Sequence, residues 1–329
     1  MIGILFKILQ ILIIAISGMV VGLFCKGIDR ILAARMQNRV GPPLVQPFMD
    51  VKKLLVKESI VSNRAVKWIF DLMPVVALSA SIIILLYLPL GGMGPLLEGD
   101  GDVMLVLYLF IVPALAMILG GFSSGSPYAH VGSEREMIKL MSFELPLTVV
   151  IVSIVWLLSF MKVENAFSLS VISGNPVWGL VGPVGFMGLL LLLLILLFVV
   201  PGEMDVVPFD VPTAGSEIAG GVLVEYSGRN LALFYLADAV KLVAISSLVI
   251  ALFLPWSLSS LLCVSGFIGL LLDALFFLAK LFAVVFVGTT FFRVIAARLK
   301  IDQTIHAYWV QCSLVALCGL ILIGIDIVI

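Results

Sequence analysis

The sequence has little charge, few histidines and no paired cysteines. Only 12% of its 329 residues are charged, whereas 62% are hydrophobic. A soluble protein of this length needs far more charge to cover its surface, so this composition excludes one. The chain has four cysteines without a C-x-x-C pair and only two histidines. These residues are too few to hold an iron–sulfur cluster or a nickel site, so we expect no redox cofactor bound by this chain alone.

Long apolar runs take the place of charge. Runs of about 18 or more apolar residues recur along the chain, and each can cross a bilayer core of roughly 30 Å as a helix. Strands of a membrane β-barrel would alternate apolar and polar residues, unlike the unbroken segment 186–200. We therefore predict an all-α membrane protein, a single polytopic domain over residues 1–329 with about eight transmembrane helices. The expected spans are 4–24, 68–90, 103–122, 139–160, 178–200, 231–254, 261–292 and 305–327. The seventh is long enough to be tilted or broken, or to extend beyond the bilayer.

Basic residues are nearly absent from alternate connections. The stretches 91–102 and 255–260 have no Lys or Arg, whereas the connection 25–67 has nine. Together with the other connections expected on its side of the membrane, it holds 15 of the 19 basic residues. Because basic loops stay in the cytoplasm, we expect these connections to be cytoplasmic and both termini to lie outside.

Two of the expected cytoplasmic connections have patterns of their own. Segment 44–58 mixes apolar and basic residues at helical spacing, which predicts an amphipathic helix at the membrane interface. Segment 201–230 begins with Pro201-Gly202 and contains further prolines and glycines. One continuous helix cannot include all of them, so we expect a broken connection buried in protein.

A few ionisable residues fall within the expected spans, where they are costly and therefore candidates for function. Glu144, in the fourth span, is either a proton-relay carboxylate or a neutral side chain hydrogen-bonded for packing. Asp238 and Lys241 share a helix face in the sixth span, and Asp273 and Lys280 share one in the seventh. Each pair either neutralises itself or belongs to a chain of charges that crosses the interior.

The connection that follows the fifth span is acidic and has no basic residue before Arg229. Its five carboxylates are Glu203, Asp205, Asp210, Glu217 and Glu225. Acids confined beside a membrane repel one another, and such coupled groups can take up and release protons. The alternative is a solvated acidic loop, but the apolar residues between the acids argue against simple solvation. We therefore treat this segment as a candidate proton path.

The same connection carries a family resemblance that extends over essentially the whole chain. Its motifs resemble those of the H-type membrane protein of complex I, which also occurs in membrane-bound energy-converting hydrogenases. The matching segments are 208–212 (PFDVP), 217–221 (EIAGG), 225–226 (EY), 35–43 (RMQNRVGPP) and 135–144 (REMIKLMSFE). Within the family, segment 35–43 looks more like the hydrogenase branch, including the archaeal sulfane sulfur reductase, than like the quinone-reducing branch.

The resemblance implies a membrane subunit that anchors a peripheral arm and links its electron transfer to proton or sodium translocation. Partners would be the iron–sulfur and catalytic subunits of that arm, antiporter-like membrane subunits and the lipid bilayer, with no nucleic acid. Iron–sulfur clusters, and nickel–iron in a hydrogenase, would belong to the partner subunits. The implied residue roles are an intramembrane acid for Glu144, an acidic path for Glu203, Asp210, Glu217 and Glu225, and docking of the arm for Arg35, Arg39 and Arg135.

The sequence also shows one departure from the family and leaves two alternatives open. Thr213 and Gly215 stand where relatives commonly have acids, so the path is less acidic than the family pattern. The first alternative is the H-type component of NADH-quinone oxidoreductase, which contributes a quinone chamber. The second is an independent secondary transporter, against which the absence of an internal repeat argues.

Overall fold

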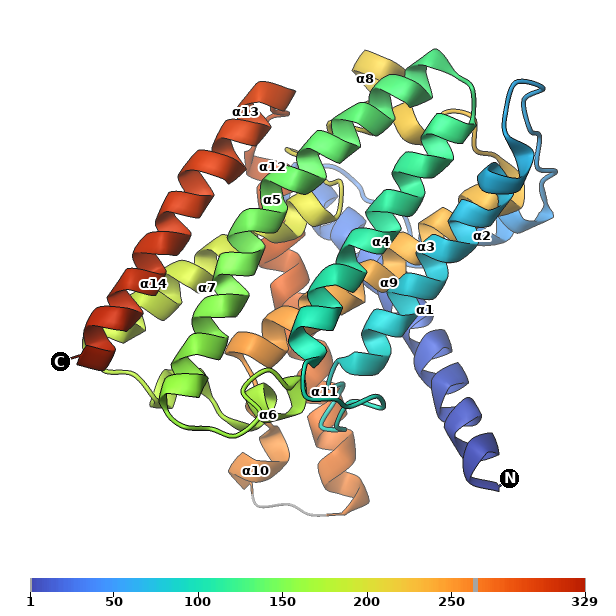
Figure 1. Cartoon of the computed structure of the whole chain (residues 1–329). Helices are drawn as coiled ribbons and strands as arrows, with labels where there is room; N and C mark the ends of the chain where they lie inside the picture. Colours follow the sequence, from blue (N-terminus) through green and yellow to red (C-terminus); the bar gives the residue numbers. More distant parts are fainter. Residues whose placement is uncertain (1, 263–265, 329) are drawn as a thin grey trace.

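Eight long apolar helical segments dominate the computed structural model, which describes residues 2–262 and 266–328 (Figure 1). These segments are α1 (Ile2–Met36), α3 (Lys67–Tyr87), α4 (Asp102–Ser123), α5 (Pro127–Phe160), α7 (Pro183–Glu203), α9 (Gly228–Phe253), α11 (Phe267–Val285) with η3 (Phe286–Phe291) and α12 (Phe292–Ile295), and α13 (Ile301–Ile305) with η4 (His306–Cys312) and α14 (Ser313–Val328). All eight are long and apolar enough to cross a membrane. No strand occurs among the described residues, and the expectation of an all-α fold with eight spans is confirmed.

Helix α9 forms the centre of the bundle. It packs against α1, α3, α7 and α11, and 89% of its most apolar window is buried, compared with 22% for the segment that contains α11. Around it, α3 packs on α4, α4 on α5, α5 on α7, and α7 on α14. Lys241, on this helix, is therefore shielded from lipid, with only 7% of its side chain exposed.

Three helices extend beyond the expected boundaries, all toward the same end of the bundle. α1 continues past residue 24 to Met36, and α5 begins at Pro127 instead of residue 139. Pro127 stands in the first turn of α5, where its missing N–H costs nothing. α7 continues through Pro201 to Glu203, because a proline so near the helix end removes only one bond and the N–H of Met204 still reaches the Val200 carbonyl.

The last two spans are continuous helical segments, Phe267–Ile295 and Ile301–Val328, and each contains an irregular turn. Short helix α10 (Leu258–Leu262) precedes α11, and residues 263–265 of the expected span 261–292 lie outside the described residues. η3 and η4 are π-helical turns inside otherwise α-helical segments. Such turns are rare and frequently mark functional positions.

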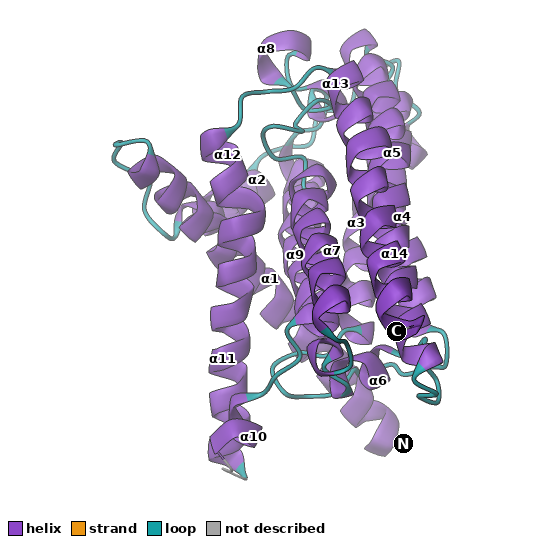
Figure 2. Ribbon diagram, turned by 90° about the vertical axis from the view of Figure 1, so that its left-hand side faces the viewer, coloured by secondary structure: helices purple, strands orange, loops and turns teal. Residues whose placement is uncertain are grey.

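The short elements divide between the two ends of the bundle (Figure 2). α6 (Leu169–Gly174) and α10 lie at one end, with η1 (Val177–Gly179) following α6. α2 (Gln46–Val56) and α8 (Gly215–Ile218) lie toward the other end, with η2 (Gly221–Leu223) following α8.

α2 corresponds to the amphipathic helix expected within 44–58. It buries Pro47 and Val51, packs against α9, and leaves Lys52 and Lys53 exposed. The broken connection is also confirmed, because α8 and η2 interrupt it and Phe209 within it is completely buried.

Candidate functional site

Five ionisable side chains meet in the interior, where the end of α7 contacts α5 and α9. They are Glu136, Lys139, Glu203, Asp205 and Lys241, which we call the buried ion cluster. Lys139 Nζ lies 2.7 Å from Glu136 Oε2 and donates a hydrogen bond to Asp205 Oδ1. Lys241 Nζ lies 2.7 Å from Glu203 Oε1 and donates to the Glu203 carbonyl at 2.8 Å. Asp205 is the most accessible of the five side chains, with 12% exposed, so all five are largely shielded from solvent.

Local sequence explains how these side chains reach one another. Glu136 and Lys139 are three residues apart on α5 and therefore share a face. Glu203 reaches the cluster because α7 continues through Gly202. A side-chain carbon at Gly202 would lie 2.8 Å from Tyr308 Cζ, so only glycine allows this close approach. Asp205 takes a left-handed conformation (φ 51°), which stops the helix and which aspartate tolerates better than most residues.

The charges of the buried ion cluster do not balance. Three carboxylates face two ammonium groups, which gives a net charge of −1 when all five are ionised. Despite the two 2.7 Å contacts, Glu136 Oε2 and both carboxylate oxygens of Glu203 accept no hydrogen bond with suitable angles. Buried charges without full compensation are costly, and a single added proton would neutralise the cluster. The arrangement is therefore suited to holding one proton.

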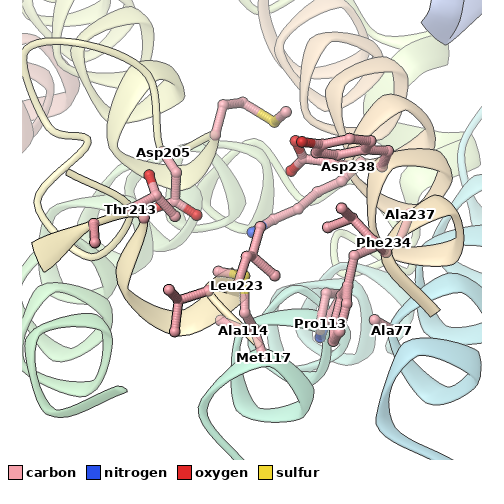
Figure 3. A pocket seen from close by; sticks show the side chains of 17 residues that line it. Ala77, Pro113, Ala114, Met117, Asp205, Thr213, Leu223, Phe234, Ala237 and Asp238 are labelled. Carbon is pink, nitrogen blue, oxygen red and sulfur yellow. The ribbon is translucent and has the colours of Figure 1, made fainter. Parts of the chain in front are cut away.

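Two cavities adjoin the cluster. The first has a volume of about 480 Å³, and its lining includes Asp205, Lys241 and Asp238. In Figure 3, Asp205 and Asp238 lie on opposite sides of this cavity, with Thr213 beside Asp205. The second has a volume of about 320 Å³ and shares Met204, Asp205, Thr213 and Asp238 with the first. Two acidic side chains thus belong to the common wall of both cavities.

Ion pairs tie separate elements together around the second cavity. Lys26 Nζ on α1 lies 2.6 Å from Asp238 Oδ2 on α9. Asp29, also on α1, accepts a hydrogen bond from Thr290 Oγ1 at 2.7 Å and one from Arg293 at 2.9 Å. These contacts join α1 to the π-helical turn η3 and to α12. The walls of the cavity are therefore made of elements far apart in the sequence.

Further ion pairs hold the two connections that border this end. Arg298 pairs with Asp210 at 2.6 Å, and its guanidinium also donates to Ser216 Oγ at 2.7 Å. Arg30 on α1 donates to Asp50 on α2 at 2.9 Å. The Arg30 hydrogen bond lowers the pKa of the Asp50 carboxyl below its ordinary value. Asp50 therefore stays ionised near neutral pH and fastens α2 to α1.

The far end of the acidic connection is anchored by an aromatic contact. The Tyr226 ring stacks on Phe70 of α3 with centroids 4.0 Å apart, and its hydroxyl donates to the Phe70 carbonyl at 3.2 Å. Burial raises the pKa of the Tyr226 hydroxyl well above its ordinary value. The hydroxyl therefore stays a neutral hydrogen-bond donor.

The relay residues named from the sequence fall into separate places. Glu203 and Lys241 belong to the buried ion cluster, and Asp238 and Asp210 line the cavities. Asp238 and Lys241 do not pair with each other, because Asp238 pairs with Lys26 and Lys241 with Glu203.

Other predicted positions lie away from the cluster. Glu144 is half-buried on α5 and lines neither of the two cavities. Asp273 accepts hydrogen bonds from the N–H and hydroxyl of Ser259, and Lys280 donates to two carbonyls at the end of α9. Asp273 and Lys280 line a third cavity of about 250 Å³, which none of the buried cluster residues lines. The four charges expected on α9 and α11 thus form two separate groups.

The predicted docking residues lie at the end with the basic connections. Arg35 and Arg39 are exposed at and beyond the end of α1. Arg135 Nη1 lies 2.6 Å from Glu217 Oε2, a pair that joins α5 to α8. Glu225 is half-buried near η2.

Sequence reasoning missed Glu136 and Lys139 as site residues. Glu136 precedes the expected fourth span, 139–160, and Lys139 is the first residue of that span, so neither residue stood out as a charge within the membrane. Two signals could have found them: Pro127, which suits the first turn of an earlier helix start, and the three-residue spacing of an acid and a lysine. Among the described residues, no group of three or more His, Cys, Asp or Glu side chains could hold a metal ion.

Comparison with known proteins gives a consistent result over nearly the whole chain. Residues 8–324 match the family model described as NADH dehydrogenase. The chain is 31% identical to the NADH-quinone oxidoreductase H subunit of Bacillus cytotoxicus, over 89% of this chain and 86% of that protein. It is 29% identical to the corresponding H subunit of Dehalococcoides mccartyi, over 92% of this chain and 81% of that protein.

A solved structure shares the fold. A chain of the membrane-bound sulfane sulfur reductase, an archaeal respiratory membrane complex, is 28% identical with a TM-score of 0.82 and covers 96% of this chain and 99% of its own length. The resemblance that the sequence motifs indicated is confirmed. The chain therefore belongs to the NADH dehydrogenase family, as a multi-pass membrane protein of the H type found in complex I-like respiratory complexes.

Proposed function

We propose that this chain is the membrane-anchor and coupling subunit of a redox-driven, ion-translocating complex of the membrane-bound hydrogenase or sulfane sulfur reductase type. The observation that carries the proposal is the buried ion cluster with its net charge of −1, next to two cavities at one end of the bundle. A redox event that changes the charge near the cavities would change the protonation of this cluster. The chain would then pass the event on as a proton movement, without a redox centre of its own.

The partners follow from this role. A peripheral arm with iron–sulfur clusters, and nickel–iron if the complex is a hydrogenase, would dock at the end that carries Arg35, Arg39 and Arg135. Antiporter-like membrane subunits would take up the signal and move protons or sodium ions. The docking end would be cytoplasmic by the distribution of basic residues, which puts both termini outside.

The first test is composition and coupling of the complex. Extraction of this chain from its host membrane in mild detergent should bring iron–sulfur subunits with it, whereas a transporter would come out alone. In sealed vesicles, Glu136→Gln should keep dye-linked redox activity within about twofold but lower ion pumping about tenfold. Glu134→Gln is the matched control, because Glu134 is exposed two residues away. Equal pumping by wild type and Glu136→Gln would overturn the assignment of the cluster.

Glu144 and the acidic connection remain proposed members of the relay. Glu144→Gln should leave assembly and dye-linked activity intact and reduce coupled pumping, since no other acid lies on that stretch of α5 between Glu136 and the helix end. Full pumping by this variant would remove Glu144 from the path. The same assay applied to Asp210, Glu217 and Glu225 would map which carboxylates of the connection take part.

Docking has its own test. Arg39→Glu should weaken attachment of the peripheral arm, because it reverses the charge of an exposed side chain on the proposed contact surface. Lys7→Glu, a reversal on the exposed face of α1 near its beginning, is the control. Unchanged subunit stoichiometry in Arg39→Glu after gel filtration would contradict the docking surface.

A second candidate function is favoured by the cavities themselves. Their combined lining includes apolar residues such as Met117, Leu223 and Phe234, which suit an isoprenoid quinone as in a NADH-quinone oxidoreductase. The test is whether the purified complex reduces a quinone and whether a quinone-site inhibitor blocks this activity. An active, inhibitable reductase would establish this alternative and exclude the hydrogenase or sulfane sulfur reductase assignment.

A further inference from the structure

Lys139 holds two carboxylates that belong to different elements. Its ammonium group lies 2.7 Å from Glu136 Oε2 on its own helix and donates a hydrogen bond to Asp205 on the connection after α7. Among the ion pairs of the described residues, it is the only cation that contacts two carboxylates. Lys139 is therefore the link between α5 and the acidic connection.

The two carboxylates differ in their surroundings. The Glu136 side chain is 1% exposed and lines neither of the two cavities beside the cluster, whereas Asp205 is 12% exposed and lines both. Of the carboxylates in the cluster, Asp205 is the one that an ion or proton in the cavities reaches first. Lys139 contacts both groups, so it links a change at Asp205 directly to Glu136.

The second lysine of the cluster is held differently. Lys241 contacts both the carboxylate and the carbonyl oxygen of one residue, Glu203, so a change at Asp205 leaves both of its contacts in place. Lys139 has no such double anchor, and a lysine side chain rotates about several bonds. The Lys139 ammonium group also lies 6.0 Å from the centre of the Phe143 ring. An aromatic ring attracts a cation but does not hold it in one orientation, as a hydrogen bond does. Of the two lysines, Lys139 is the one free to shift its contacts.

We propose that Lys139 is a positioning residue that decides which carboxylate holds the single excess proton of the buried ion cluster. With Lys139 drawn to Glu136, the proton resides on Asp205 at the cavity wall. With Lys139 drawn to Asp205, the proton resides on Glu136 in the interior. Both states contain the same number of protons and the same total charge, so only the place of the proton and the contact of the ammonium group differ. This inference rests on the proposed coupling function and names the element that would connect the cavities to the interior.

The groups that face Lys139 come from four elements. Glu136 lies on α5, Glu203 on α7, Asp205 on the connection and Lys241 on α9. Glu203 and Lys241 neutralise each other, so they set a constant background. The exchange of the proton between Asp205 and Glu136 is therefore the change that Lys139 controls.

Substitutions at the three residues test the proposal in the assembled complex. Lys139→Met should lower ion pumping about tenfold with dye-linked activity within about twofold, because the fully ionised cluster then has a net charge of −2 and no ammonium group remains between Glu136 and Asp205 to set which of them is charged. Lys139→Arg should restore at least about half of the pumping, since a guanidinium can also contact two carboxylates. Lys7→Met is the control, because Lys7 is exposed far from the cluster.

Infrared spectroscopy supplies a readout that a merely structural role would not change. Wild type should show a deuterium-sensitive band of a protonated carboxylic acid that Glu136→Gln diminishes. Asp205→Asn imitates a permanently neutral Asp205, so it should keep Lys139 on Glu136 and abolish the Glu136 contribution to the band. This spectrum decides the matter even if Lys139→Met fails to assemble.

The outcomes separate this inference from the proposed function. Two results would overturn the role of Lys139 and leave the coupling function standing. One is that Lys139→Met pumps as well as an active wild type, and the other is that the Glu136 band is unchanged in Asp205→Asn. Absence of redox-driven pumping in wild-type vesicles would instead overturn the coupling function on which the inference rests.

Discussion

Lys241 joins the centre of the bundle to the end of α7 through a single partner, Glu203. Its ammonium group lies 2.7 Å from the Glu203 carboxylate and donates a hydrogen bond to the Glu203 carbonyl at 2.8 Å. Both side chains are at most 7% exposed. A pair of this kind gives little net stability when intact, but removal of one partner leaves an uncompensated buried charge.

The pair should therefore be far more sensitive to single than to double substitution. Lys241→Met is expected to destabilise the protein by about 3–5 kcal/mol, whereas Lys241→Met combined with Glu203→Gln should recover most of that loss. Thermal unfolding of the purified complex in detergent measures both values, with Lys7→Met as the control. Equal losses in the single and double variants would show that the two residues are not energetically coupled.

The α1 to η3 contact predicts a local effect. Asp29 accepts hydrogen bonds from Thr290 and Arg293 and is only 9% exposed. Asp29→Ala leaves both donors without this partner, which should cost about 1–3 kcal/mol and release the π-helical turn. Hydrogen exchange should accelerate in Phe286–Phe291 and leave His306–Cys312 unchanged. Equal acceleration in both π-helical turns would indicate a global loss of stability and contradict a local tether.

Much of this fold could be predicted because a membrane restricts the choices. Apolar runs of sufficient length must be helices there, so the number of spans follows from the sequence. Helix ends were less predictable, because α1, α5 and α7 extend past their apolar runs. Polarity marks where a lipid environment ends, and a helix can continue through protein or water beyond that point.

The site was predicted in part, and the limit was pairing across the sequence. Glu203, Asp238 and Lys241 were recognisable as costly charges in or beside spans. Their partners were not, because the Lys26–Asp238 contact joins residues 212 positions apart and no local pattern specifies it. A charged residue can therefore be identified as functional before its partner is known, and only the packed structure supplies the partner.

Gly202 offers a test of close packing beside the cluster. A side-chain carbon there would lie 2.8 Å from Tyr308 Cζ and even nearer to the Tyr308 hydroxyl oxygen. Gly202→Ala should destabilise the protein by about 1–3 kcal/mol, although alanine is the better helix former, because overpacking outweighs propensity. Gly215→Ala is the control, since nothing lies within 4 Å of the added carbon.

Tyr308→Phe should relieve part of the loss in Gly202→Ala, because it removes the atom nearest the added methyl group. The same change in wild type loses the hydrogen bond from Tyr308 to the Phe198 carbonyl. Tyr308→Phe should therefore stabilise the Gly202→Ala variant but destabilise the wild type. A double-mutant cycle measured by thermal unfolding tests this difference. Additive effects would contradict a steric contact between the two positions.

The Arg30–Asp50 pair predicts how α2 responds to acid. The Arg30 hydrogen bond lowers the pKa of Asp50 from its ordinary 3.8, so the pair contributes stability above that value and loses it as pH falls through the lower, folded-state pKa. Amide exchange in Gln46–Val56, corrected for its intrinsic pH dependence, should thus show less protection at about pH 3 than at about pH 6. Asp50→Asn should remove this difference, because asparagine does not titrate, while Glu58→Gln nearby should keep it. A difference that persists in Asp50→Asn would assign the acid response to another carboxylate and refute the role of this pair.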